Sequence, residues 1–498
     1  MKHYKLLINN EWVSADSGEK FSTYCPATGE ELATFENAGI SDVDKACLAA
    51  RAAFENGSWS ELENNERAKI MLRAADIIEN RWDEFCKAEA LDVGKPISEV
   101  TSADMPFSIY ALRYFANLAR EIKGEYIHIP QEPYFHDYLV YEPYGVVGIL
   151  SPYNYPLHLL TRSLAPALAA GNTVVCKASS LTPLTTAMLG EVVLEAGFPP
   201  GVVNILSGPG STAGEALASH REVDIVALTG SERIGRRLLE LSAQSERMKK
   251  NILELGGKGP VIVEPDCNYN ATLEKIAEGL LSNSGQVCCA QTRLLLHESI
   301  YDSFLSDLVT EVSKWKPGDI LDPNTKLGAV INKEQLDKFD ATIQDAVQSG
   351  AQVLCGGERF TGGFADKGAF YKPTILVNVQ TDMKCYREEI FGPVLVVVRY
   401  SQIDEAIRLA NDSKFGLGAG IFTENYRTIH YASKKLNAGT VFVNTPNMAR
   451  MNAPFGGNKN SGLGREYGII GLHEYLRTKN TFWNMAFGYP EEQNTIYY

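Results

Sequence analysis

The chain has 498 residues, and chains of this length usually form more than one hydrophobic core, so we expect two or three domains. Its composition is that of an ordinary globular protein, and a net charge of −14 argues against nucleic-acid and anionic-membrane partners. The sequence shows no secretory signal, no apolar run of membrane-spanning length and no zinc-type cysteine spacing. We therefore expect a cytoplasmic protein with free thiols and no metal.

The region from about 142 to 255 alternates short β-prone runs with helical stretches. The β-prone runs lie at 145–150, 173–177, 202–206, 224–229 and 251–255, and the helical stretches at 157–170, 183–197, 211–220 and 232–244. This alternation is typical of a parallel sheet covered on both faces by helices. Several runs end in Gly, Ser or Thr just before a helix, where helix N-termini can face the phosphates of a ligand.

The rest of the chain falls into three parts. Residues 1–124 are rich in helical patterns and are expected to pack around the first sheet. Residues 256–460 alternate again, which predicts a second α/β domain, with β-prone runs at 293–297, 373–377, 393–400, 418–423 and 440–444. Segments 125–143 and 470–498 are β-prone and aromatic, which suits edge strands that pair with another subunit; a surface hairpin and a loose tail are the alternative.

Cys288 and Cys289 end the segment NSGQVCC and are candidate nucleophiles. A cysteine attacks as the thiolate, which requires a helix N-terminus, a nearby cation or a base. Cysteines in apolar stretches are more often inert core residues, and the local sequence does not decide between these two thiols.

Two further polar residues stand out by their position. Glu254 lies inside an apolar run just before two glycines, and burial would raise its pKa as a general base requires, although it could equally be the buried partner of Lys258. Asn154 lies in a predicted turn between strand and helix. Its amide can donate to an oxyanion or simply stabilise the turn.

Two glycine-rich segments are candidate phosphate-binding turns. GPGSTA (208–213) matches the pattern GxGxxA, and TGSERIG (229–235) also follows a β-prone run and opens a helix. Either segment can equally be a tight strand-to-helix turn without a ligand.

Four motifs in order carry a resemblance to a known family: LELGGK (253–258), NSGQVC (283–288), EEIFGPV (388–394) and PFGGNKNSGLGRE (454–466). Together they resemble the aldehyde dehydrogenase superfamily, and the similarity runs along nearly the whole chain. The resemblance implies an α/β fold with a Rossmann-like NAD(P)-binding domain (1–124 and 144–255), a catalytic α/β domain (256–460) and a β-strand oligomerisation arm. It also implies NAD or NADP as cofactor, a small aldehyde as substrate and a homodimer or homotetramer.

The resemblance also implies residue roles. Cys288 corresponds to the nucleophile, Glu254 to the base that activates water, and Asn154, with the backbone N–H of Cys288, to the oxyanion hole. The aldehyde would be oxidised through a thiohemiacetal and a thioester on Cys288. The implied cofactor residues are Ser151, Tyr153, Lys177, Ser180, Gly210, Gly230, Ser231, Gly235, Glu389 and Phe391, and the implied substrate residues are Tyr155, Arg162, Cys289 and Ala449.

The chain departs from the family pattern at Ser180. Many members that prefer NAD have Glu three residues after the lysine that corresponds to Lys177, where it binds the adenosine 2′-hydroxyl. A serine there accepts a 2′-phosphate that a carboxylate would repel, so we expect NADP+ to be accepted alongside NAD+ or preferred.

Arg162 bears on the substrate because it lies on the helix that lines the family's substrate tunnel. Lactaldehyde and succinic semialdehyde dehydrogenases have a similarly placed arginine, and a guanidinium favours a small polar or carboxylated aldehyde. The alternative is an arginine paired with a buried carboxylate. Arg162 also disfavours the cationic substrate of a betaine aldehyde dehydrogenase, although Tyr153 and Tyr155 could contribute to an aromatic box.

The sequence argues against two other classes of protein. A CoA-acylating relative would typically lack the base at position 254, and a non-catalytic structural protein would be expected to have lost Cys288, Glu254 or Asn154. All three residues are present.

Overall fold

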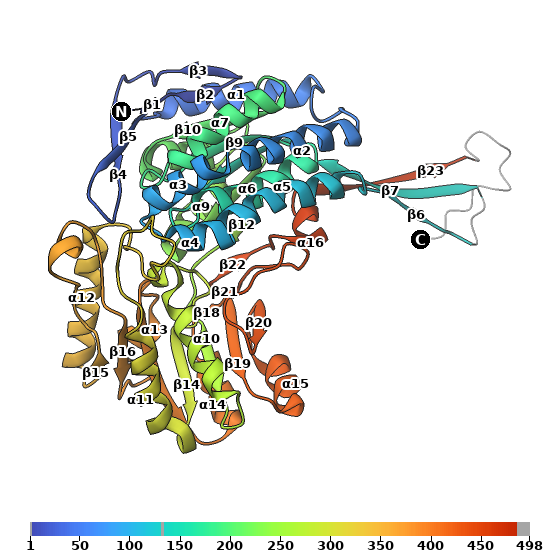
Figure 1. Cartoon of the computed structure of the whole chain (residues 1–498). Coiled ribbons are helices and arrows are strands. Elements are labelled where there is room, and N and C mark those ends of the chain that lie inside the picture. Colours follow the sequence, from blue (N-terminus) through green and yellow to red (C-terminus); the bar gives the residue numbers. More distant parts are fainter. Residues whose placement is uncertain (1, 131–133, 486–498) are drawn as a thin grey trace.

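The computed structural model describes residues 2–130 and 134–485. It contains two large sheets, one above the other in Figure 1, and a projecting three-stranded arm. The predicted α/β class is confirmed. Parts of the segments 125–143 and 470–498, namely 131–133 and 486–498, lie outside the described residues.

The first sheet has eight strands in the order β22-β12-β11-β8-β9-β10-β2-β3. Its outer strands are β22 (Gly462–Leu463) at one edge and β2 (Leu6–Ile8) and β3 (Glu11–Val13) at the other. Five neighbouring strands are parallel and correspond to the five predicted runs: β8 (Val146–Leu150), β9 (Thr173–Ala178), β10 (Val203–Ser207), β11 (Ile225–Thr229) and β12 (Lys250–Glu254). The chain runs outward from β8 through β9 to β10 and then crosses back to β11 on the other side of β8. Such a reversal places a ligand-binding crevice at the carboxyl ends of the strands beside β8.

Helices cover both faces of this sheet because its strands are apolar on both sides. In β8, Val147 and Ile149 pack into one core and Val146 and Leu150 into another. The first core includes α2 (Asn64–Asn80), α3 (Trp82–Val93), α5 (Met105–Ala119), α6 (Pro156–Ala169) and α7 (Leu184–Ala196). The second includes α1 (Ile40–Glu55), α8 (Glu215–Ser219) and α9 (Glu232–Gln244).

The second sheet has seven strands in the order β15-β16-β17-β14-β13-β19-β20, of which β15 alone runs antiparallel to its neighbour. Its strands are β13 (Pro260–Val263), β14 (Arg293–His297), β15 (Gln352–Cys355), β16 (Thr374–Val377), β17 (Val394–Tyr400), β19 (Gly418–Phe422) and β20 (Thr440–Val443). The helices of this part are α10 (Tyr269–Leu281), α11 (Tyr301–Val312), α12 (Lys333–Gln348), α13 (Lys384–Arg387), α14 (Ile403–Asn411) and α15 (Tyr426–Lys435). The second sheet lies within the range predicted for the catalytic domain, whereas the first sheet includes a strand from residues 462–463, outside all of the predicted ranges. The domain boundaries themselves stay a prediction.

The arm combines parts of segments 125–143 and 470–498, which were predicted to form edge strands. β6 (Glu125–Ile127) and β23 (Leu476–Asn484) flank β7 (Phe135–Pro143) in an antiparallel sheet that extends away from the rest of the chain (Figure 1). The segment from 476 is therefore a strand paired within the same chain as far as Asn484, not a loose tail.

The prediction for the N-terminal third was incomplete. Besides helices, this part contains the strands β1 (Lys2–Tyr4), β2 (Leu6–Ile8), β3 (Glu11–Val13), β4 (Lys20–Tyr24) and β5 (Glu31–Glu36). β2 extends the first sheet as an antiparallel neighbour of β10. At three to six residues, these strands are too short to show a clear period in the sequence.

The opposite edge of the first sheet is closed by β22 (Gly462–Leu463), from the GxGRE part of the last motif. Gly462 pairs with Glu254 and Leu463 with Leu253. Gly462 has φ +150°, and a Cβ there would lie 2.1 Å from the carbonyl oxygen of Leu253, so this close pairing requires glycine.

We predict that Gly462→Ala destabilises the protein, because the added methyl group meets a backbone carbonyl that cannot move without breaking the strand pairing. Overpacking of this kind costs about 1–3 kcal/mol. The thermal unfolding midpoint should fall by several degrees. Gly214→Ala is the control: the nearest atom is 3.7 Å from its new Cβ, so its unfolding midpoint should stay near that of the unsubstituted protein. Equal midpoints for the two variants would contradict this explanation.

Candidate active site

Glu254 is the last residue of β12 and lies opposite Thr229, the last residue of β11. Its side chain is 2% exposed, and burial raises the pKa of its carboxyl. The two glycines that follow allow two other segments to approach closely. A Cβ at Gly256 would lie 2.1 Å from the Glu389 carboxylate, and one at Gly257 would lie 2.4 Å from the carbonyl oxygen of Cys288. The end of β12 therefore brings the predicted base beside the predicted nucleophile.

Cys288 follows a turn of unusual backbone conformation after α10. Asn283, Ser284 and Gly285 have φ of 47°, 54° and 78°, so three consecutive residues are left-handed. Side-chain contacts hold this turn: the Glu99 carboxylate accepts a 2.7 Å bond from the backbone N–H of Asn283, and the Ser284 hydroxyl donates to the carbonyl of Gly328. Left-handed residues other than glycine are strained and persist only where surrounding contacts hold them. Here the left-handed turn leads the chain from α10 to Cys288.

The Cys288 thiol is half-buried, and it and the Glu254 carboxyl influence each other's pKa. The Cys289 thiol and burial raise the pKa of Cys288 well above its ordinary value. The resting side chain is therefore a thiol. It must lose its proton to a base before it can attack.

Asn154 lies between β8 and α6, at the carboxyl end of the central strand. It is 4% exposed, and its side-chain Nδ2 donates a 2.9 Å hydrogen bond to the carbonyl of Gln286, two residues before Cys288. Its own carbonyl accepts bonds from the buried Lys95 ammonium (3.0 Å) and from the Asn283 side chain (3.0 Å). The amide is thereby fixed next to the Cys288 segment, with a second N–H left to donate.

Arg162, for which a substrate role was predicted, is buried and paired with Glu254 in this structure. Its Nη2 lies 3.3 Å from Glu254 Oε2 and donates a 2.6 Å bond to Thr229 Oγ1, and the side chain is 1% exposed. This is the alternative that the sequence left open, an arginine paired with a buried carboxylate. It also replaces the pairing of Glu254 with Lys258, because Lys258 Nζ has no hydrogen-bond partner among the described residues.

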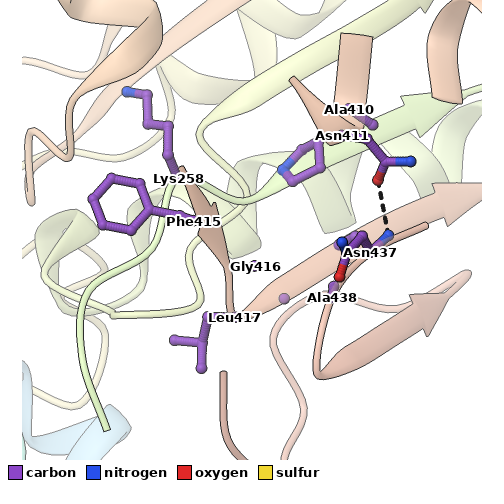
Figure 2. Close-up of a pocket in the computed structure, with 11 residues that line it drawn as sticks. Lys258, Ala410, Asn411, Phe415, Gly416, Leu417, Asn437 and Ala438 are labelled. Atoms are coloured by element: carbon purple, nitrogen blue, oxygen red, sulfur yellow. Dashed lines mark hydrogen bonds between the residues drawn. The ribbon is translucent and has the colours of Figure 1, made fainter. Parts of the chain in front are cut away.

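Lys258 instead borders a small cavity near the start of β13. Figure 2 shows Lys258 and Phe415 with Asn411 and Asn437, which are joined by a 2.8 Å hydrogen bond from the Asn437 backbone. The cavity measures about 10 Å³, room for about one water molecule. Burial lowers the pKa of Lys258 to about 7, so the amine can remain buried without a partner carboxylate.

Glu389 and Phe391 lie on the loop before β17 that faces this end of β12. Glu389 accepts a 2.9 Å bond from the backbone N–H of Gly257, and burial raises its pKa to about 7. Phe391 has φ 58° and packs edge-on against Tyr153, with ring centroids 5.8 Å apart. The structure thus brings these three predicted cofactor residues to one place.

The other predicted cofactor residues follow neighbouring strands of the first sheet. Ser151 follows β8, and Gly210 follows β10. Lys177 is in β9, where its Nζ donates to the carbonyls of Ala178 (2.6 Å) and Gly208 (3.3 Å), and burial lowers its pKa to about 8. Ser180 is half-buried, two residues after the end of the same strand. All four therefore lie at the carboxyl edge, beside the crossing point at β8.

The second glycine-rich segment opens α9. Ser231 caps this helix by accepting a bond from the backbone N–H of Ile234. A Cβ at Gly235 would lie 2.7 Å from Leu255, so glycine lets the helix pack closely on the strand end. Gly230 and the first turn of α9 thus present a helix N-terminus at the same edge, which suits a pyrophosphate.

Comparison with known proteins agrees with this geometry. The family model described as the aldehyde dehydrogenase family matches residues 12–481. The chain belongs to the aldehyde dehydrogenase family. It is 40% identical to human retinal dehydrogenase 2, over 96% of this chain and 91% of that protein.

Two solved structures of the family are also similar. Betaine aldehyde dehydrogenase from Staphylococcus aureus in complex with NAD+ has a TM-score of 0.95 at 36% identity, covering 98% of this chain and 95% of that chain. The NAD+ complex of a Bacillus cereus aldehyde dehydrogenase has a TM-score of 0.94 at 39% identity, with 97% of each chain covered. The names of the relatives refer to different aldehydes, so family membership settles the reaction class and leaves the substrate open.

Of the remaining substrate residues predicted from the family, Tyr155 lies near Cys288, and Cys289 follows Cys288 directly in the chain. Tyr155 carries the Lys95 ammonium 3.5 Å above its ring centre, and its pKa responds to both adjacent thiols. Cys289 is buried, and Ala449 packs against the large hydrophobic core of the first sheet, so the place of Ala449 in the substrate site stays a prediction.

Several residues of this aldehyde dehydrogenase site escaped the sequence analysis. Tyr467 is 1% exposed with φ 63°, and its hydroxyl lies 2.7 Å from His158 Nε2. Glu466 accepts a 2.7 Å bond from Ser163 on α6. Glu466 ends the motif PFGGNKNSGLGRE, and His158 lies one helical turn before Arg162, so their positions were visible in the sequence although their contacts were not.

Within residues 2–130 and 134–485, no helix is both long and apolar enough to cross a bilayer. The same residues include no cluster of three or more His, Cys, Asp or Glu side chains placed to bind a metal ion.

Proposed function

We propose that this chain oxidises an aldehyde to a carboxylic acid with NAD+ or NADP+, through a thioester on Cys288. The observation that carries the proposal is the meeting of Cys288, Glu254 and Asn154 at the carboxyl edge of the first sheet, beside the strand crossing that suits a dinucleotide. A CoA-acylating enzyme would not need the buried base.

The side chains divide the reaction into two halves. The Cys288 thiol gives its proton to solvent water, and its sulfur then attacks the aldehyde carbon, while the Asn154 amide and the Cys288 backbone N–H donate to the oxygen that becomes negative. A bound nicotinamide would accept the hydride that leaves this carbon, which yields a thioester. Glu254 then takes a proton from water as the water oxygen attacks the thioester, and the C–S bond breaks to release the acid.

The residues at the carboxyl edge fit a dinucleotide. The N-terminus of α9 would face the pyrophosphate, Lys177 would bind the adenosine ribose, and Glu389 would bind the nicotinamide ribose. Gly210 is exposed, and a Cβ placed there would have no heavy atom within 4 Å, which leaves room on the adenine side.

Substrates are proposed to be small, polar aldehydes. The Tyr467–His158 pair and Tyr155 put polar groups near Cys288. Because Glu254 already neutralises Arg162, the arginine adds less affinity for a carboxylated aldehyde than a free guanidinium would. A panel of lactaldehyde, succinic semialdehyde, betaine aldehyde and hexanal would rank these classes by kcat/KM.

The arm is proposed to join subunits in a homodimer or homotetramer. Tyr126, Phe482 and Trp483 on its strands are 57–58% exposed, and large exposed aromatic side chains on a projecting sheet are typical of a protein interface. Light scattering of the purified chain distinguishes these assemblies from a monomer.

The two adjacent thiols provide the first test. We predict that Cys288→Ser abolishes aldehyde oxidation, because a serine hydroxyl beside Glu254 is a far weaker nucleophile than a thiol. Cys289→Ser is the matched control and should keep most of the activity. Full turnover in Cys288→Ser, or loss of activity in Cys289→Ser alone, would contradict the assignment.

The cofactor proposal predicts the effect of a charge at position 180. Ser180→Glu should lower kcat/KM for NADP+ by about tenfold or more while NAD+ is much less affected, because a carboxylate repels the 2′-phosphate. Ser180→Gln controls for side-chain size without the charge. A hundredfold preference of the unchanged chain for NAD+, or a cofactor ratio that Ser180→Glu leaves unchanged, would show that Ser180 does not admit NADP+.

A further inference from the structure

The buried pair of Arg162 and Glu254 joins two rigid elements of the site. Arg162 is on α6, and Glu254 ends β12. Arg162 Nη2 bridges Glu254 Oε2 at 3.3 Å and Thr229 Oγ1 at 2.6 Å, while Arg162 Nε and Glu254 Oε1 have no hydrogen-bond partner among the described residues. The guanidinium therefore holds one carboxylate oxygen and leaves the other oxygen available.

The contact of Arg162 with Glu254 matters because the other titratable groups that face Glu254 are acids, a thiol and a phenol. Acidic groups face it from two directions: Glu389 from the loop before β17, and Glu466 from the segment that packs on α6. The Cys288 thiol and the Tyr467 hydroxyl complete its titratable surroundings. Among the described groups that influence the pKa of Glu254, Arg162 supplies the positive charge.

Burial and this cation act on Glu254 in opposite directions. Desolvation raises the pKa of the carboxyl, and the charge and hydrogen bond of Arg162 lower it. Burial by itself lowers the pKa of Arg162, but attraction to Glu254 and Glu466 outweighs this and raises it, so the guanidinium remains charged. Without Arg162, no cation would oppose the effect of burial on the pKa of Glu254, which favours the protonated carboxyl that cannot act as a base.

We propose that Arg162 is a positioning residue for Glu254, which keeps the buried carboxylate ionised and held against Thr229 with one oxygen free to accept a proton from water. The inference rests on the proposed thioester mechanism and concerns its second half. Water loses a proton to Glu254 and forms a C–O bond to the thioester carbon, and the C–S electron pair returns to the Cys288 sulfur. In this role Arg162 acts through the Glu254 carboxylate and not directly on the substrate.

The test compares Arg162→Met, which removes the charge at similar length, with Arg162→Lys, which keeps it. Rapid mixing with cofactor and aldehyde resolves the first NADH formed from the later hydrolysis of the thioester, across a range of pH. In Arg162→Met we expect the acid limb of the hydrolysis rate to move up by at least about one pH unit, because the pKa of Glu254 rises once its cation is lost. The amplitude of the first NADH formation should stay near one per site.

Two comparisons separate this effect from general damage. In Arg162→Lys the acid limb of the hydrolysis rate should lie close to its position in the unsubstituted chain. Added guanidinium ion should partly restore the hydrolysis rate of Arg162→Met. Arg73→Met is the matched control. It removes an arginine of α2 that donates to the Ala196 carbonyl and is not among the groups facing Glu254, so its acid limb should not move.

An acid limb that stays in place in folded Arg162→Met would overturn the proposal, as would a loss of rate that is equal at every pH and is not rescued. If Arg162→Met does not fold, Thr229→Val removes the second anchor of the guanidinium and should move the limb in the same direction by a smaller amount; no movement there also overturns the proposal. Absence of the first NADH formation in the unchanged chain would instead contradict the proposed function.

Discussion

The site depends on one constraint, a carboxylate that must stay ionised at the buried end of a strand. Glu254 is 2% exposed, and the Arg162 guanidinium 3.3 Å away offsets part of the cost of burying its charge. Breaking such a pair by removing one partner typically costs about 3–5 kcal/mol, because the other charge is left buried and unpaired. The neighbouring features accommodate this pair: Gly462 lets β22 approach Glu254, and Gly256 and Gly257 let the Glu389 and Cys288 segments meet it.

Much of the fold could be predicted from hydrophobic patterns. The five central strands of the first sheet begin and end within one residue of the predicted runs, because strands buried on both faces are short, continuous and apolar. The pattern did not predict β2, β22 or the antiparallel edge strand β15. These strands have two to four residues, and their pairing depends on tertiary contacts with distant segments rather than on local periodicity.

The sequence indicated which residues belong to the candidate site, but it did not indicate how they contact one another. The motifs and the family resemblance pointed to Cys288, Glu254 and Asn154, but the contact of Arg162 on α6 with Glu254 depends on how this helix packs on the sheet. The left-handed run at Asn283, Ser284 and Gly285 was equally hidden, since two of its residues are not glycine and adopt this conformation only because Glu99 and neighbouring carbonyls hold them. Family resemblance suggested a substrate role for Arg162, and the sequence could not show that its guanidinium is paired with Glu254 inside the protein.

The most direct test of the central claim uses Glu254→Gln, which keeps the shape of the base and removes its capacity to accept a proton. Mixed with cofactor and a polar aldehyde, this variant should form about one NADH per site and then stop, and peptide mass spectrometry should find the acyl group on Cys288. Continued turnover at the unchanged rate, or an acyl group on Cys289 or any other residue, would contradict a mechanism in which Cys288 carries the thioester and Glu254 releases it.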